Sequence, residues 1–328
     1  MPRGRDALER AVKLCLTPLA WRRLVLLAAL LLGAVKAVSA ADVLPVAEIA
    51  PGVFVHQGQQ QVWSHASAGD VANLGFVVGS QCVAVIDTGG SPSLGAALLA
   101  AVRQVTSLPV CYVINTHVHP DHLLGNQAFA ALEPRPRFVG HARLPASLSA
   151  RAPFYRDALQ RELGVDMAAD GVIFPDLVVD DRHTLDLGGL RLALRAWPTA
   201  HTDNDLSVQV GERGPIFLGD LLFAGHLPVI DGRLLGWLEV MDALEGLDLR
   251  LAVPGHGAPT TDWKAAMALQ RSYLLGVRDG VRAAIDAGQP IAEAVEALAG
   301  VGVDNWLLVD EFHRRNLTAA YAELEWED

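Results

Sequence analysis

The sequence is poor in cysteine and in basic residues. Three cysteines among 328 residues are too few for a disulfide-rich scaffold. Charged residues make up 19% and apolar residues 51%, with 30 glycines and 18 prolines, which excludes a disordered or a collagen-like chain. Lys and Arg number 26 against 37 Asp and Glu, a formal net charge of −11. Because an acidic protein repels phosphate backbones, we expect no nucleic-acid partner.

The first forty residues differ from the rest of the chain. They are basic up to Arg23, then uncharged and apolar over residues 24–35, and they end in the small residues Val38-Ser39-Ala40. These are the three parts of a signal peptide over 1–40. The apolar run is shorter than the ~20 residues that span a bilayer, so we expect cleavage, a periplasmic location and no stable membrane anchor afterwards. A retained anchor is the alternative, and Arg22-Arg23 leaves general or twin-arginine secretion open.

Two cysteines follow the predicted signal peptide. Cys82 and Cys111 each begin an apolar, β-rich run. If the two runs are neighbouring strands, the cysteines can cross-link in an oxidising compartment. Two buried free thiols are the alternative.

From about residue 50, short β-rich runs alternate with Gly/Pro turns and helical stretches, which favours a layered α/β architecture. We expect helices at 91–105, 123–131, 142–163, 261–288 and 305–325. We expect strands at 53–56, 74–78, 82–86, 110–115, 137–140, 184–186, 190–196, 205–209, 216–218 and 251–253. No linker or repeat interrupts this series, so residues 41–328 are predicted to form one domain with a helical C-terminal part.

Four side chains that bind metals follow the strand predicted at 110–115: His117, His119, Asp121 and His122. Alternate residues of an extended segment face the same way, so His117 and His119 point into one site. Pro120 keeps His119 out of the helical conformation. Three imidazoles and a carboxylate at a strand end predict a cation site.

Further candidates follow later strands of the predicted series, namely His201, Asp220 and His256. Loops at strand ends are where α/β proteins build sites. Asp87 ends an earlier strand, where it either orients a ligand histidine or closes a turn. Of the remaining histidines, His226 and His65 lie in stretches expected to border the cleft.

The segment 117–122 matches the H-x-H-x-D-H signature, and the whole pattern resembles the metallo-β-lactamase-fold hydrolases over about residues 50–260. The resemblance implies a four-layer αβ/βα sandwich. It also implies two metal sites bridged by Asp220, one formed by His117, His119 and His201 and the other by Asp121, His122 and His256.

The bridging position separates subfamilies. Asp220 stands where many true β-lactamases carry Cys or Ser, and a carboxylate there is similar to glyoxalase-II-like thioesterases and lactonases. Residues 84–90, 197–205 and 218–223 resemble quinoprotein relay system zinc metallohydrolases. That resemblance implies an exported protein with a functional link to periplasmic, pyrroloquinoline quinone (PQQ)-dependent quinoproteins.

Imidazole and carboxylate ligands without thiolate favour zinc, here two Zn²⁺ per chain, over iron or manganese. The expected function is a hydrolase in which a metal-bridged hydroxide attacks a carbonyl of a small ester, thioester or lactone. Asp121 is the predicted catalytic residue, which orients the hydroxide and passes on its proton. A β-lactam hydrolase and a non-catalytic metal-binding accessory protein for quinoprotein maturation are the alternatives.

Overall fold

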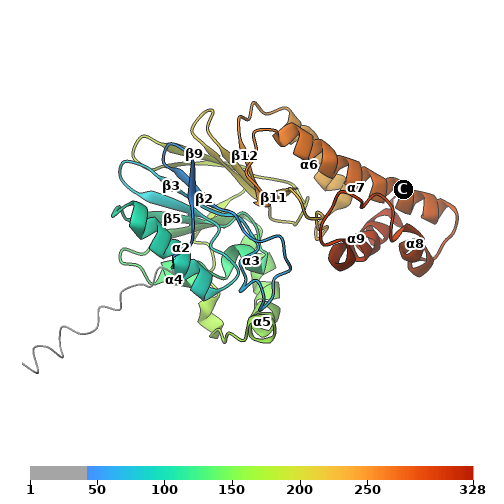
Figure 1. Ribbon diagram of the computed structural model, residues 1–328, viewed down its shortest axis with the longest axis horizontal. Helices are drawn as coiled ribbons and strands as arrows, with labels where there is room; N and C mark the ends of the chain where they lie inside the picture. The colour runs from blue at the N-terminus through green and yellow to red at the C-terminus, as the bar shows by residue number, and fades with distance from the viewer. Residues whose placement is uncertain (1–42, 328) are drawn as a thin grey trace, which may run out of the picture. The chain divides into compact units, whose positions relative to one another are not determined.

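The computed structural model describes residues 43–327 and arranges their strands in two sheets (Figure 1). The predicted signal peptide, 1–40, lies outside the described residues. Within the described part, none of the helices combines the length and the apolar character needed to cross a membrane.

The first sheet has seven strands in the order of the sequence. From β1 to β4 neighbouring strands are antiparallel, and from β4 to β7 they are parallel. The carboxyl ends of β4 and β5 therefore lie at the same edge, which brings Asp87 close to the segment after β5. The strands are β1 (Ala47–Ala50), β2 (Val53–His56), β3 (Leu74–Val78), β4 (Val83–Ile86), β5 (Val110–Ile114), β6 (Arg137–His141) and β7 (Leu177–Val179).

The second sheet has five strands in the order β12-β11-β10-β9-β8. Only β11 and β12 are parallel to each other. Its strands are β8 (Arg182–Asp186), β9 (Arg191–Ala196), β10 (Leu206–Val210), β11 (Ile216–Phe223) and β12 (Ala252–His256). Every residue of β11 is buried, because both faces of this strand are covered, and its sequence accordingly reads as a nearly continuous apolar run.

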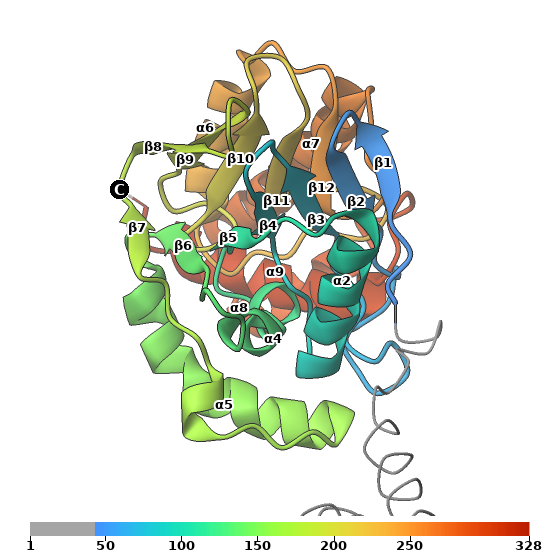
Figure 2. The same ribbon diagram turned by 90° about the vertical axis from the view of Figure 1, so that its left-hand side faces the viewer.

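Helices cover the outer face of each sheet. Helices α2 and α4 lie on the first sheet and α6 and α7 on the second (Figures 1 and 2). The helices are α2 (Pro92–Val105), α3 (Pro120–Leu123), α4 (Asn126–Ala130), α5 (Leu144–Leu163), α6 (Leu234–Glu245), α7 (Trp263–Asp286), α8 (Ile291–Leu298) and α9 (Val309–Leu324), with a short 3₁₀ turn at Ala169–Gly171.

Three apolar cores separate these four layers. Between α2, α4 and the first sheet lie Leu98, Val102, Phe129, Phe76 and Val85. Between the two sheets lie Val77, Ile86, Leu194 and Val208. Between the second sheet and its helices lie Leu218, Leu222, Trp237, Met241 and Leu274. The expected αβ/βα sandwich is confirmed.

The helix expected at 123–131 is wrong in detail, because the chain forms two short helices, α3 and α4. The N–H of Gly125 donates to the Gly89 carbonyl oxygen at 2.9 Å, so the helix does not continue there. A Cβ atom on Gly125 would lie 2.0 Å from the carbonyl oxygen of Thr88. The close approach of this turn to the loop after β4 thus requires glycine.

Other boundaries also differ from the expectations. Strand β11 extends to Phe223, so Asp220 lies inside it rather than after it. Strands β1 and β7 and helices α6 and α8 were not expected. The two strands have only four and three residues and lie at the edges of their sheet, so they carry little periodic signal.

Cys82 and Cys111 form a disulfide, with their Cα atoms 5.8 Å apart. Val83 of β4 pairs with Val110 of β5, and this pairing places the two cysteines side by side. Of the two alternatives that the sequence left open, the structure contains the cross-link.

Candidate metal centre

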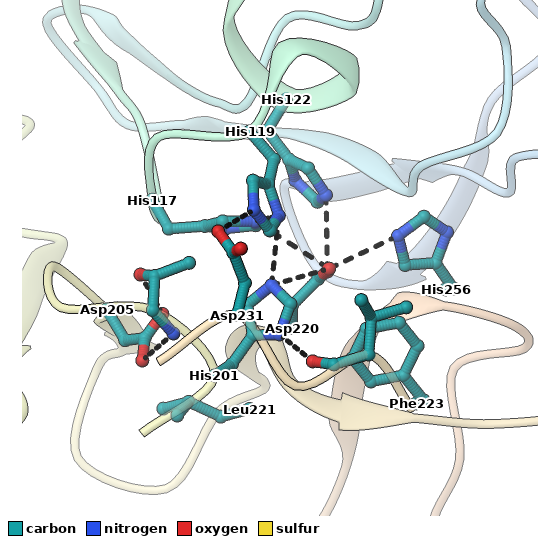
Figure 3. Close-up of polar contacts among 12 residues, drawn as sticks. His117, His119, His122, His201, Asp205, Asp220, Leu221, Phe223, Asp231 and His256 are labelled. Atoms are coloured by element: carbon teal, nitrogen blue, oxygen red, sulfur yellow. Dashed lines mark hydrogen bonds and ion pairs between the residues drawn. The ribbon is translucent and has the colours of Figure 1, made fainter. Parts of the chain in front are cut away.

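The side chains of the predicted site converge at one edge of the two sheets. Figure 3 shows the five histidines and Asp220 of this site. Four of them follow β5, one lies between β9 and β10, one lies within β11 and one ends β12. Their donor atoms form two groups, each with all atoms within 4.8 Å of one another. The first group is His117, His119, His201 and Asp220, and the second is Asp121, His122 and His256. All seven residues singled out in the sequence are therefore brought together.

Asp220 lies between the two groups. Its Oδ1 is 3.2 Å from Nε2 of His122, and its Oδ2 is 3.2 Å from Nε2 of His201 and 3.4 Å from Nε2 of His256. The contact between Asp220 Oδ1 and His122 Nε2 lacks hydrogen-bond geometry, so both buried atoms have no hydrogen-bond partner. Buried polar atoms are rarely left in this state. The donor set thus fits a cation, and Asp220 lies where its carboxylate can contribute to both donor groups.

The outward ring nitrogen of each histidine has a partner of its own. His119 turns Nδ1 toward the centre, and the other four turn Nε2. Such partners fix the orientation and the tautomer of a ligand imidazole and make it a better donor. The partners are Thr116 Oγ1 for His117 (3.0 Å), Asp231 Oδ2 for His119 (3.0 Å), Asp87 Oδ2 for His122 (2.8 Å), the Val229 carbonyl for His201 (2.7 Å) and the Val71 carbonyl for His256 (2.9 Å).

Asp87 organises the segment after β5. Its carboxylate accepts hydrogen bonds from the backbone N–H and the hydroxyl of Thr116 and from Nδ1 of His122, each at 2.8 Å. Its φ of +56° lies in the left-handed region, which is uncommon for a residue other than glycine. The hydrogen bond to His122 agrees with the expectation that Asp87 orients a histidine of the donor set. Asp87 makes this hydrogen bond from a strained backbone conformation.

Glycine is required at two positions beside the donor groups. A Cβ atom on Gly255 would lie 1.8 Å from Oδ1 of Asp220. Gly219 has a φ of +52°, and a Cβ atom there would lie 2.7 Å from Cβ of Thr116. The glycines before Asp220 and His256 are therefore steric requirements of the site.

Burial and charge shift the pKa values of the cluster. Burial raises the pKa of Asp220, but the imidazoles of His256 and His122 outweigh it and hold that pKa well below its usual range. Burial lowers the pKa of His122, but the carboxylates, Asp220 first, raise it well above the ordinary value. Burial lowers the pKa of His117, with a further lowering by His122. A proton on His122 thus balances negative charge that a bound cation would neutralise.

A cavity of 330 Å³ opens onto the cluster, within the range of small-molecule sites. His226 lines it, as expected, with its ring centre 4.5 Å from that of His256. Burial lowers the pKa of His226 to about 3, so its imidazole is neutral. Trp63 also lines the cavity, and its indole N–H donates to the Gly90 carbonyl at 3.0 Å. His65, by contrast, is exposed and does not line the cavity.

Four further residues at the cavity carried no sequence signal: Asp231, Arg151 of α5, and Phe312 and Arg315 of α9. None belongs to a motif or follows a predicted strand at a site-like position. Asp231 is 112 residues from His119, to which it is hydrogen-bonded, so only tertiary packing reveals the pair.

We expect Asp87→Asn to weaken zinc binding by about 10–100-fold, because an amide NH₂ replaces one of the oxygens that accept from Thr116 and His122. Competition with a chromophoric chelator at neutral pH measures the effect. Asp186→Asn is the control, because the Asp186 carboxylate caps the turn after β8 by accepting from Gly188 and Gly189. Equal affinity in wild type and Asp87→Asn would contradict the positioning role.

Comparison with solved structures places the fold among known proteins. The sec-alkylsulfatase Pisa1 from Pseudomonas sp. is 15% identical, with a TM-score of 0.65, and the match covers 86% of this chain and 50% of that one. A metallo-β-lactamase from Pontibacter korlensis is 20% identical, with a TM-score of 0.56 and coverage of 70% and 98%. A metallo-β-lactamase family protein from Thermus thermophilus is 20% identical, with a TM-score of 0.60 and coverage of 85% and 94%.

The chain thus spans about half the length of the sulfatase that it resembles. No curated protein sequence matches it. Residues 68–256, more than half of the chain, match the family model of the metallo-β-lactamase superfamily. This range contains every member of both donor groups. The chain therefore belongs to the metallo-β-lactamase superfamily.

Proposed function

We propose that the protein is an exported dinuclear zinc hydrolase that cleaves a small ester, thioester or lactone at its carbonyl. The observation that carries this proposal is that all five imidazoles are arranged in the same way. Each has one ring nitrogen fixed by an outer partner and the other turned toward two carboxylates at the wall of the cavity.

The donor set favours zinc, because it consists of imidazole nitrogens and carboxylate oxygens without a thiolate; iron and manganese are the alternatives. Its two groups support two ions, with Asp220 between them. When bound, such ions polarise a carbonyl and make a water nucleophilic at neutral pH. The protein contributes the fixed positions of the donors and a cavity for the substrate.

Asp121 is suited to move the proton of the attacking water. Its Oδ2 lies 3.5 Å from Nε2 of His256 and 3.7 Å from Nε2 of His122, and the same residue lines the cavity. A carboxylate beside both donor groups and at the cavity can take the proton from the attacking water and deliver it to the leaving oxygen or sulfur.

Two observations support export and the quinoprotein link. The disulfide between Cys82 and Cys111 suits an oxidising compartment. The three stretches that resemble quinoprotein relay system hydrolases all contribute to the centre, through Asp87, His201 and Asp220. The resemblance to quinoprotein relay system hydrolases therefore lies at the candidate metal centre itself. A resemblance at the centre that would carry the reaction supports a functional link to periplasmic quinoproteins.

We expect close to two zinc ions per chain, measured by elemental mass spectrometry on protein purified without chelators. We also expect metal-dependent hydrolysis in a panel of esters, thioesters and lactones, because the cavity meets both donor groups. His119→Ala lowers the metal content and abolishes turnover, whereas His183→Ala, on the exposed face of β8, changes neither.

Other outcomes of this experiment separate the competing functions. Fast hydrolysis of nitrocefin, with no turnover in the panel, indicates a β-lactam hydrolase. Two zinc ions without turnover of any substrate indicate an accessory protein. A chain that binds no metal contradicts the proposal.

We expect Asp121→Asn to lower kcat by about 10²–10⁴-fold with a smaller change in KM, because the amide cannot accept the proton. Steady-state kinetics on samples of equal zinc content measure the effect and separate proton transfer from loss of metal. A kcat equal to that of the wild type refutes the role of Asp121.

We expect protein recovered from the periplasm of a secreting host to begin near Ala41, because the small residues before it form the cleavage site. Such a chain exposes no reactive thiol on denaturation without reductant and two after reduction. Intact mass and thiol titration measure both. A mass that retains residues 1–40 refutes processing.

A further inference from the structure

Two arginines from distant parts of the chain meet at the cavity. Arg151 lies on α5 and Arg315 on α9, and both line it. Nη1 of Arg151 is 3.0 Å from Oδ2 of Asp231, and Nη2 of Arg315 is 3.1 Å from its Oδ1. Helix α5 is held beside the metal-binding loop by an apolar cluster that includes Leu148 and Val118.

The charges of this group do not cancel. Among residues 43–327, Asp231 is the only carboxylate that forms an ion pair with either guanidinium. Its Oδ2 also contacts Nε2 of His119 at 3.0 Å. Two guanidinium groups thus share one carboxylate, and one positive charge is left at the wall of a cavity in a protein whose formal net charge is −11.

The two arginines keep hydrogen-bond donors beyond their contacts with Asp231. A guanidinium has five N–H donors and binds carboxylates in a two-pronged geometry. Each arginine forms one ion pair with Asp231, so further N–H donors remain on both. Tyr155 also lines the cavity, and its buried hydroxyl lies beside the guanidinium of Arg151. Burial raises the pKa of Tyr155, so the hydroxyl stays protonated and can donate.

We propose that Arg151, Arg315 and Tyr155 form a subsite for a carboxylate on the substrate, remote from the bond that is cleaved. This inference rests on the proposed hydrolase function and specifies its substrate class: a small ester, thioester or lactone that carries a carboxylate. Asp231 lies between this subsite and His119. The carboxylate of Asp231 and the imidazole ring of His119 therefore separate the substrate carboxylate from the metal centre. The lining of the cavity also includes the aromatic side chains of Trp63, Phe223 and Phe312.

The subsite is partly built by the C-terminal helices. Arg315 and Phe312 lie outside residues 68–256, the range that matches the superfamily model. The catalytic groups thus come from the part of the chain that the superfamily shares, whereas recognition of the carboxylate draws on the additional helix α9.

The test compares the binding of dicarboxylates and monocarboxylates to the zinc-loaded protein by titration calorimetry. Succinate, glutarate and adipate each carry a second carboxylate, and butyrate does not. We expect at least one of these dicarboxylates to bind at least tenfold more tightly than butyrate, because its second carboxylate reaches the arginines. We expect Arg315→Gln and Arg151→Gln each to abolish most of this preference.

Arg314→Gln is the matched control. Arg314 is the neighbouring residue on α9, and its guanidinium pairs with Glu296 rather than lining the cavity. This variant keeps the preference for the dicarboxylate. Thermal unfolding of all three variants identifies any that are misfolded.

A second readout is the ratio of kcat/KM for mono(4-nitrophenyl) glutarate to that for 4-nitrophenyl butyrate. We expect this ratio to exceed one in the wild type and to fall about tenfold in Arg315→Gln. Arg315→Gln could instead lower kcat/KM equally for the two esters and weaken the binding of dicarboxylates and butyrate equally. That result would mean that Arg315 acts only by holding Asp231 against His119, and it overturns the inference. No dicarboxylate preference in the wild type overturns it as well.

The two readouts distinguish failure of the subsite from failure of the hydrolase proposal. Tight, arginine-dependent binding of a dicarboxylate without hydrolysis of any substrate keeps the subsite and refutes the hydrolase function. Hydrolysis without preference for the anionic ester keeps the function and refutes the subsite.

Discussion

The structure depends on one buried carboxylate, Asp220, held among the imidazoles of His122, His201 and His256. A buried charge is costly unless it is paired or binds a cation. Here the pairing is incomplete, because Oδ1 of Asp220 and Nε2 of His122 have no hydrogen-bond partner. The protein thus maintains a buried polar pocket whose donor atoms fit a cation, and the neighbouring loops hold those atoms in place.

The two sheets supply the rigidity that such a pocket needs. Three packed cores hold four layers together, and the donors sit on strands or on short segments at their ends. The outer contacts then fix each ring, most extensively at Asp87, which accepts three hydrogen bonds from Thr116 and His122. Strain in the Asp87 backbone and the glycine at position 255 are the local consequences of this arrangement.

The proposed carboxylate subsite accounts for how a chain of this charge would take an anionic substrate. Most of its acidic residues lie elsewhere, and those at the cavity either belong to the donor groups or, as Asp231, lie between two guanidinium groups. Asp231 also contacts His119, so the proposed recognition site and the metal centre share one residue. In this proposal, helix α9, which lies beyond the family match, adapts the shared site to a particular substrate.

Local regularities of the sequence predicted the layered α/β fold and the cluster at 117–122, whereas the grouping of the donors into two sites and the four-layer sandwich came from the family resemblance. The alternation of an extended segment aligns His117 with His119, and short apolar runs specify strands buried on both faces. The edge strands β1 and β7, the split between α3 and α4, and the extent of β11 were not predicted, because they depend on neighbours in space. The sequence left the bond between Cys82 and Cys111 open against two free thiols, and strand pairing decided it. The meeting of Asp231, Arg151 and Arg315 beside His119 became visible in the folded chain alone. These contacts join residues brought together by strand pairing and helix packing, and no spacing along the chain encodes them.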